Sequence, residues 1–146
     1  MIRSYTSADK STLLELLRLN TPQYFHPSEE PDFLFYLEKE LESYYVFLDN
    51  ETIVGCGGIN YFPDQKQARL SWDIIHPQQQ GKGVGRQLLE HRLTEIRSNP
   101  EIETIVVRTS QLVYPFYQKL NFKLSRVEKD FWAAGFDLYE MSLPAR

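Results

Sequence analysis

A glycine-rich segment is the first part of the sequence in which residue types and spacing indicate a chemical role. Residues 80–85 read QGKGVG, and they follow a strand pattern and precede a helical one. Glycines let a chain turn sharply and approach a ligand closely. The free N–H groups at the start of a helix, together with its dipole, attract anions. Because Lys82 and Arg86 add positive charge, the segment predicts a phosphate or pyrophosphate site.

Two widespread phosphate-binding motifs do not fit this segment. A Walker A loop needs a wider spacing between its first glycine and Gly-Lys-Ser/Thr than the sequence offers. A dinucleotide-binding fingerprint needs a third glycine where Arg86 stands, and it opens the first βαβ unit of its domain. Here the segment lies in mid-chain. The turn therefore belongs to another class of anion site.

The segment resembles the Q/R-x-x-G-x-G/A signature of the GCN5-related N-acetyltransferases (GNAT superfamily). Gln80, Gly83 and Gly85 carry the match. Just before them, residues 75–77 (IHP) stand where this family has V-x-P at the end of its fourth strand. The two motifs occur in the family's order and spacing, which strengthens the resemblance.

Two later segments extend the resemblance over nearly the whole chain. Residues 115–122 (PFYQKLNF) resemble the family's F-Y-x-K-L-G-F, and residues 137–143 resemble its closing strand. Asn121 replaces the usual glycine, but Asn tolerates a left-handed backbone, so the turn is expected to persist. The resemblance implies a GNAT fold of the α/β (α+β) class. Such a fold has a mixed, mostly antiparallel central sheet of about six or seven strands, flanked by about four helices, with strands splayed at the cofactor site.

Hydrophobic periodicity places helices and strands around these motifs. The glycines at 55, 57 and 58 indicate a bulge or a close backbone approach within a strand. Residues 129–136, before the last strand, are interpreted as a loop. We expect strands at 2–6, 44–48, 52–61, 68–75, 103–109, 122–128 and 137–143, and helices around Leu13–Leu17, Phe33–Leu41, Val84–Ile96 and Leu112–Leu120.

Length and composition narrow the class of protein. The 146 residues suit a single domain, 1–146, with an ordinary hydrophobic share of 42%. A net charge of −4 argues against nucleic acid or an anionic membrane as partner. Cys56 is the single cysteine, and no Cys/His cluster has metal-binding spacing, so no metal is expected. The sequence shows no signal peptide or membrane-spanning run, which favours a cytoplasmic location.

The resemblance implies acetyl-CoA (coenzyme A) as co-substrate. Backbone groups of Ile74 and Ile75 match the strand end that pairs with the pantetheine amides in this family. Ser110 stands where many members have an asparagine that contacts the cofactor. The positions that match the pyrophosphate-binding turn are Gln80, Gly81, Lys82, Gly83, Val84 and Gly85, with Arg86 as an additional contact.

Two residues are candidates for moving protons. Tyr117 matches the family tyrosine that donates a proton to the leaving thiolate; the alternative is a half-buried packing residue. Asp73 lies two residues before Ile75 and so projects to the same side of the strand, where it could act as base. The alternative for Asp73 is a solvated or salt-bridged carboxylate, and both interpretations stay open.

The acceptor pocket of this family is built between the first two helices and before the last strand. Tyr24, Phe25 and Trp132 lie in these regions, beside the acidic residues 29–32 (EEPD). Aromatic rings next to carboxylates suit a cationic amine. Acidic residues at a helix start are also explained by the helix dipole alone.

The sequence thus predicts an enzyme, an N-acetyltransferase that acts on a primary amine of a small molecule by direct transfer. Two alternatives remain. One is a catalytically idle acyl-CoA-binding sensor on the same fold, and the other is a protein or peptide N-acetyltransferase. Since members of the family are often dimers, a homodimer is kept as an option.

Overall fold

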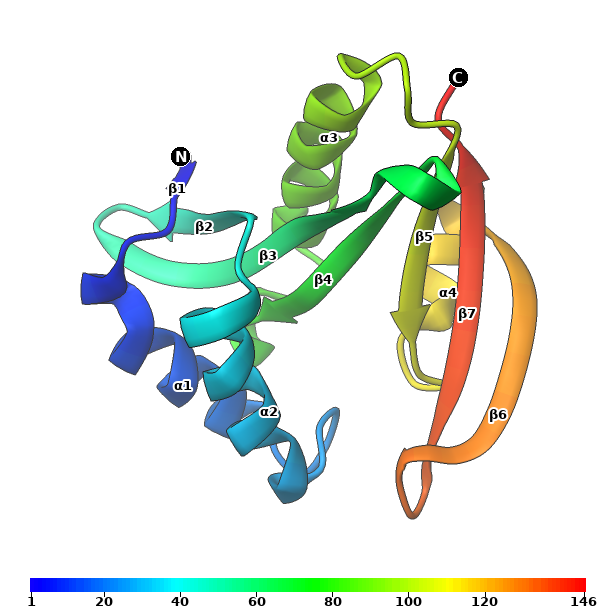
Figure 1. The fold of residues 1–146 in the computed structure, drawn as a ribbon. Helices are drawn as coiled ribbons and strands as arrows, with labels where there is room; N and C mark the ends of the chain where they lie inside the picture. Colours follow the sequence, from blue (N-terminus) through cyan, green and yellow to red (C-terminus); the bar gives the residue numbers. More distant parts are fainter.

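The computed structural model describes residues 1–146, which form one seven-stranded sheet with helices on both faces (Figure 1). The strand order across the sheet is β1-β2-β3-β4-β5-β7-β6. The strands are β1 Ile2–Ser4, β2 Ser43–Asp49, β3 Thr52–Phe62, β4 Gln67–Ile75, β5 Thr104–Thr109, β6 Lys123–Ala133 and β7 Phe136–Pro144. The helices are α1 Lys10–Leu19, α2 Glu30–Phe35, α3 Val84–Arg97 and α4 Tyr114–Lys119, and a π-helical turn, η3, continues α2 over Tyr36–Glu40.

The sheet parts between β4 and β5. These two strands form the one parallel pair, and all other neighbours are antiparallel. They are paired only between Gln67–Leu70 and Thr104–Val107. Beyond that point β4 bonds to β3 alone and β5 to β7 alone, and Figure 1 shows the two strands diverging. The expected mixed, mostly antiparallel sheet with splayed strands is confirmed.

The helices cover opposite faces of this sheet. Leucines of α1 and aromatic residues of α2 and η3 pack on one face, and leucines of α3 with Tyr117 of α4 pack on the other. Each helix repeats its apolar residues with the period of an amphipathic helix. No helix in the structure combines the length and the apolar character needed to span a membrane.

A bulge in β3 and β4 decides which side chains face which layer. The register shifts at residues 56–58, opposite Trp72, whose φ is 49°. Because a bulge adds a residue, alternation along β4 is offset. Ser71 and Trp72 both contact the α1–α2 side, while Asp73 contacts α3. The glycines of β3 allow this crowding, since a Cβ at Gly57 would lie 2.6 Å from Asp73 Oδ1.

The C-terminal hairpin differs from the prediction. Residues 129–136 were expected to form a loop that carries Trp132, but β6 continues to Ala133, which pairs with Phe136 across a tight turn. The prediction was wrong because β6 is an edge strand that is exposed over most of its length. It therefore lacks the apolar alternation that identifies a half-buried strand.

Candidate active site

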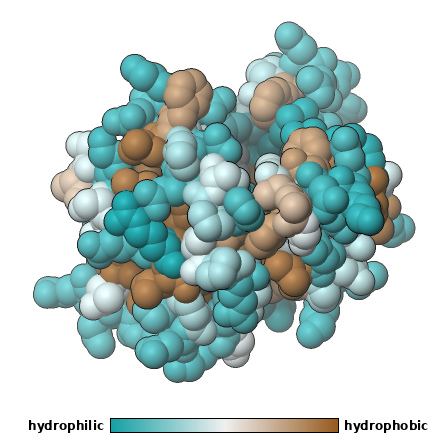
Figure 2. Space-filling model, turned by 90° about the horizontal axis from the view of Figure 1, so that it is seen from below, coloured by the Kyte–Doolittle hydropathy of each residue, from teal (hydrophilic) through white to brown (hydrophobic).

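A cavity of about 720 Å³ opens where β4 and β5 part. Its walls come from β3, β4 and β5, the segment between α1 and α2, the glycine-rich turn, α4 and the β6–β7 hairpin. Figure 2 shows the end of the molecule where α2 and this hairpin lie, with separate apolar patches interspersed among hydrophilic residues. The parting of the sheet therefore creates the one large site of this structure.

The glycine-rich turn borders the cavity with unpaired backbone N–H groups. Gly81 and Gly83 have φ values of 77° and 88°, and α3 begins directly after them at Val84. The amides of Gly81, Gly83 and residues 84–86 donate no hydrogen bond within the protein. A Cβ at Gly81 would meet no atom within 4 Å, so the space over the turn is open. Converging amides at a helix start fit a phosphate group.

The side chains around this turn differ in whether they line the cavity. Gln80 and Arg86 line the cavity, whereas Lys82 does not. The amide of Lys82 is also engaged, in a long bond of 3.4 Å to the carbonyl of Gln79. Arg86 Nε donates to Glu90 Oε1 at 3.0 Å. The turn therefore offers mainly backbone donors, and Arg86 shares its charge with Glu90.

The unpaired half of β4 presents backbone groups to the cavity. The amide of His76 donates to the carbonyl of Val54 on β3 at 2.8 Å. Because successive N–H groups of a strand alternate in direction, the amide of Ile75 points to the open side. The side chain of Ile74 is buried against α1 and α2, and that of Ile75 packs on α3. Both side chains belong to the core, which is the arrangement that a backbone role at the cavity requires.

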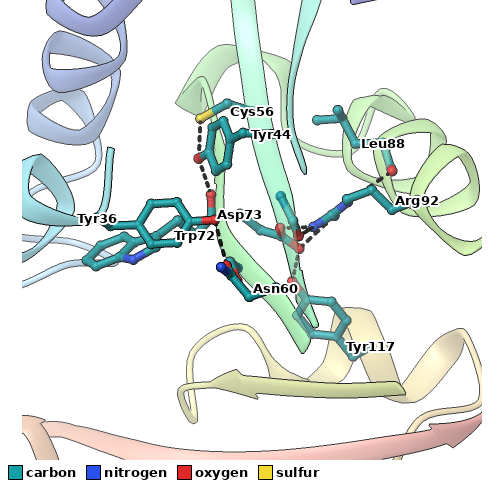
Figure 3. A network of polar contacts seen from close by, with 11 residues as sticks. Tyr36, Tyr44, Cys56, Asn60, Trp72, Asp73, Leu88, Arg92 and Tyr117 are labelled. Atoms are coloured by element: carbon teal, nitrogen blue, oxygen red, sulfur yellow. Dashed lines mark hydrogen bonds and ion pairs between the residues drawn. The ribbon is translucent and has the colours of Figure 1, made fainter. Parts of the chain in front are cut away.

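Asp73, Arg92 and Tyr117 form a polar cluster beside this open edge (Figure 3). Arg92 donates to both carboxylate oxygens of Asp73, at 2.5 and 3.0 Å, and Tyr117 Oη donates to Asp73 Oδ2. Arg92 also donates to the carbonyls of Leu88 and Gly58, each at 3.1 Å. The side chain of Arg92 is 1% exposed and that of Asp73 is 20% exposed. Asp73 is therefore salt-bridged, which the sequence left as an alternative.

Burial and charge decide the protonation of this cluster. Burial raises the pKa of Tyr117 well above its usual value, and the charge of Asp73 raises it further. Burial alone would lower the pKa of Arg92, but the adjacent Asp73 carboxylate raises it. The phenol therefore keeps its proton and the guanidinium its charge at neutral pH.

A second hydrogen-bond network lies on the other side of β4 (Figure 3). Tyr36 Oη and Ser71 Oγ both donate to Asn60 Oδ1, at 2.7 and 2.6 Å. Tyr44 Oη donates to the carbonyl of Trp72 at 2.7 Å. These bonds hold the bulge in place and thereby fix the indole of Trp72 at the cavity wall.

The single cysteine lies beneath this bulge. Cys56 has no exposed surface, and its Sγ lies 3.3 Å from Tyr44 Oη, which gives its proton to the carbonyl of Trp72. Burial raises the pKa of its thiol to about 12. Since the thiolate is the nucleophilic form, Cys56 is not a nucleophile at neutral pH.

The aromatic residues that the sequence assigned to the acceptor all line the cavity. They are Tyr24, Phe25 and Trp132. Phe25 stacks on Trp72 with 6.2 Å between ring centroids. Trp132 Nε1 donates to the carbonyl of Thr109, at the end of β5, at 3.1 Å. Together these lining side chains make up the aromatic wall of the cavity.

The acidic residues near α2 have separate roles. Glu29 lines the cavity and is buried, and it accepts a hydrogen bond from the amide of His26 at 2.8 Å. Burial raises the pKa of Glu29. Glu30 instead pairs with Arg18 at 2.7 Å on the surface. Of the acidic residues 29–32, only Glu29 is thus placed to influence a ligand.

Ser110 lines the cavity but also serves the local fold. Its Oγ accepts a hydrogen bond from the amide of Leu112 at 3.2 Å, and its carbonyl accepts from the amides of Val113 and Tyr114. These bonds set the start of α4. Ser110 therefore helps to place Tyr117, in addition to any contact it makes with a ligand.

A sequence model of the Acetyltransferase (GNAT) family matches residues 11–122, a segment that contains the glycine-rich turn, Asp73 and Tyr117. The chain belongs to this family. The resemblance seen in the sequence motifs is confirmed, and the left-handed turn expected at Asn121 is present with a φ of 74°.

Three proteins illustrate what this GNAT chain is similar to. It is 27% identical over 132 residues to the amino-acid acetyltransferase of Mannheimia succiniciproducens. The aligned region covers 87% of this chain and 28% of that protein. The chain is 30% identical over 74 residues to the L-2,4-diaminobutyric acid acetyltransferase of Vibrio cholerae, covering 49% and 43%. The chain thus spans just over a quarter of the first relative. An aminoglycoside 6′-N-acetyltransferase complexed with coenzyme A shares the fold, with a TM-score of 0.78 at 16% identity over 100% and 97% of the chains.

Sequence reasoning missed Arg92, the centre of the polar cluster. A signal was available, because Arg92 lies on the helix face that also carries Leu88, Leu89 and Ile96. A charged residue within a buried stripe needs a partner of opposite charge. The GNAT motifs gave no indication that Asp73, on another element, was that partner.

Arg92→Met should destabilise the protein, because it removes one partner of a buried pair. We expect the free energy of unfolding to fall by about 3 kcal/mol. Adding Asp73→Asn should restore part of the loss, since a neutral amide needs no counter-charge. Urea denaturation of the single and double variants measures this coupling. Strictly additive losses would show that the two side chains do not stabilise each other.

Proposed function

We propose that this chain is an acetyl-CoA-dependent N-acetyltransferase that transfers the acetyl group directly to a primary amine of a small molecule. The observation that carries the proposal is a convergence within one cavity. Unpaired amides of the glycine-rich turn, the open edge of β4 and the Tyr117–Asp73 pair all border it. Family membership and relatives named as acetyltransferases of amino acids support the activity and a small acceptor.

The glycine-rich turn and β4 suit two parts of acetyl-CoA, its pyrophosphate and its pantetheine arm. The amides of Gly81, Gly83 and residues 84–86 would bind its pyrophosphate, with Gln80 beside them. The open backbone edge at residues 74–75 would pair with its pantetheine amides. These assignments rest on groups that have no partner within the protein.

The cluster at the centre of the cavity can manage the protons of the reaction. Bound acetyl-CoA supplies an activated thioester. Because an alkyl amine has a pKa of about 10, it must lose a proton to attack. We assign Asp73 as the acceptor of that proton and Tyr117 as the donor to the leaving sulfur.

The hydrogen bond between Asp73 and Tyr117 lets the cluster return to its starting protonation state. After Tyr117 Oη has given its proton away, Asp73 can return the proton taken from the amine, since Oη bonds to Asp73 Oδ2. Of the two protons that the ammonium group loses, one thus moves from nitrogen to sulfur, and the other, released once the nitrogen has attacked the thioester, leaves to solvent, so that the cluster regains its starting charge. Arg92 holds the carboxylate in place throughout.

The acceptor would lie against the aromatic wall of Tyr24, Phe25 and Trp132. Aromatic faces attract a cationic amine before it is deprotonated. Glu29, buried at the same wall, adds a polar group within the cavity.

Gly83→Asp should abolish binding of coenzyme A, because it places a carboxylate among the amides that face the phosphates. We expect the Kd to rise on the order of a hundredfold or more through charge repulsion and steric clash. Gly135→Asp is the matched control, with a φ of 83° and open space in the β6–β7 hairpin. Isothermal titration calorimetry with coenzyme A compares them. Equal affinities would refute the assignment of the turn.

Tyr117→Phe should lower kcat on the order of a hundredfold, because the proton donor is lost. The KM for acetyl-CoA should change little, since the phenol already bonds to Asp73 and its interaction with sulfur strengthens only as the thiolate leaves. Tyr114→Phe on the same helix is the control, since Tyr114 neither lines the cavity nor makes a side-chain hydrogen bond. Steady-state thiol release gives both constants, and an unchanged kcat would remove Tyr117 from the chemistry.

Thiol release against a panel of amino acids, polyamines, aminoglycosides and peptides with a free N-terminus tests the activity itself. We expect transfer to a small amine. Tight binding of coenzyme A without release across the panel would identify an acyl-CoA sensor. Release with peptides alone would identify a peptide N-acetyltransferase.

A further inference from the structure

A buried amide oxygen opens into the cavity from the end of α1. Asn20 is 2% exposed, and its Nδ2 donates to the carbonyl of Leu16 at 2.9 Å. Its Oδ1 accepts no hydrogen bond within the protein. No side-chain oxygen or nitrogen that is sealed from solvent lacks a partner, so this Oδ1 reaches open space. The open space that Asn20 lines is the cavity.

A buried carboxylate opens into the same cavity. Glu29 is 7% exposed, and its Oε2 accepts the amide of His26 at 2.8 Å, while Oε1 has no partner within the protein. No basic side chain pairs with Glu29, because Arg18 pairs with Glu30 instead. Burial raises the pKa of Glu29, and the charge of Asp32 raises it further. The cavity thus holds a carboxylate whose charge nothing in the protein balances.

Aromatic rings lie around these two oxygen atoms. The amide of Phe25 donates to the carbonyl of Asn20 at 3.2 Å, and its ring stacks on Trp72. Phe33 follows Glu29 by one helical turn and lies 4.9 Å from the same indole. Ring faces attract cations, and carboxylate and amide oxygens accept the N–H groups of an ammonium ion. Charge and composition therefore match a cationic nitrogen.

Two hydroxyl groups on the same side of the cavity also present lone pairs. Asn60 Nδ2 donates to the carbonyl of Glu40 and to Glu42 Oε2, each at 2.8 Å. Its Oδ1 therefore faces Tyr36 and Ser71 and accepts the protons of both. With these protons engaged, the two hydroxyl oxygens can only accept hydrogen bonds from a ligand. A ligand rich in N–H donors suits this side.

The cationic site is separate from the proposed reacting centre. Figure 3 shows Tyr36 and Trp72 on one side of β4 and Arg92, the partner of Asp73, on the other. Arg69 lies on the first side, but its guanidinium group is held by Gln65 and Gln67 and so leaves Glu29 unpaired. An acceptor whose amine meets Asp73 therefore needs a second group to reach this site.

We propose that the acceptor is a diamine, whose second, positively charged nitrogen binds to Asn20 and Glu29 while the first reacts at Asp73. The proposal rests on the proposed acetyltransferase function and names its substrate class. Asn20 and Glu29 are then specificity residues. They select for the charge of the second nitrogen, and the acceptor needs no carboxylate.

The first test compares matched acceptors on the unmodified protein. The probes are the linear diamines from 1,3-diaminopropane to 1,8-diaminooctane. Each is measured beside the amino alcohol of the same length, which replaces the second amine with a neutral hydroxyl group. For the diamines that react, we expect kcat/KM to exceed that of the amino alcohol at least about tenfold, the effect of a hydrogen bond to a charged group. Equal or better use of the amino alcohols would overturn the proposal and leave the acetyltransferase function standing.

Glu29→Gln locates the preference, since glutamine keeps an oxygen for the amide of His26 and removes the charge. It should raise the KM for the diamine about tenfold or more. The KM for the amino alcohol and for acetyl-CoA should stay within about twofold. Glu30→Gln is the matched control, because the neighbouring Glu30 pairs with Arg18 and does not line the cavity.

Thermal unfolding verifies that both variants are folded. A diamine-to-alcohol ratio that Glu29→Gln does not lower would overturn the proposal. An equal rise in KM for both kinds of acceptor would also overturn it, since Glu29 would then receive the reacting amine itself.

A binding measurement separates this proposal from the proposed function. Calorimetric titration of the unmodified protein, loaded with coenzyme A, uses the same diamines and amino alcohols and needs no turnover. Tighter binding of diamines without thiol release from acetyl-CoA would sink the enzyme but support the cationic site. The absence of both binding and turnover with every diamine would overturn the cationic site.

Discussion

The buried ion pair of Arg92 and Asp73 joins four parts of the molecule. Arg92 comes from α3, Asp73 from β4, and the pair bonds to Tyr117 of α4 and to the carbonyl of Gly58 on β3. Removing two charges from water is costly, and attraction offsets the cost only where the remaining donors are satisfied. The bulge at Trp72 turns Asp73 toward α3, and Gly57 leaves room for the pair. The bulge in β3 and β4 therefore accommodates the buried guanidinium group of Arg92.

The same bulge lies where β4 leaves β5, so the polar cluster and the parted strands are one arrangement. Backbone groups on the open edge of β4 have no partner within the protein, and such groups need water or a ligand. An extended ligand with amide groups can take the place of the missing strand. In the proposed reaction, the cavity combines a sheet edge that would orient one substrate with an aromatic wall that would face the other.

Features encoded by short segments could be predicted from the sequence. The glycine-rich turn, the helix faces and the left-handed Asn121 depend on local backbone preferences or on periodicity, and all are present. Features that depend on pairs of residues far apart in the sequence could not be predicted. Asp73 gives no sign in the sequence that Arg92 is its partner, because the bulge that turns it is set by tertiary contacts.

The position of Cys56 gives this protein a built-in reporter of its own opening. The thiol is the single one in the chain, has no exposed surface, and carries a pKa raised to about 12. Electrophilic labels and oxidants cannot reach it while α1 and α2 cover the bulge of β3. The rate at which it is alkylated therefore follows the frequency with which that layer lifts from the sheet, and ligands that close the cavity should slow the rate by holding the layer down.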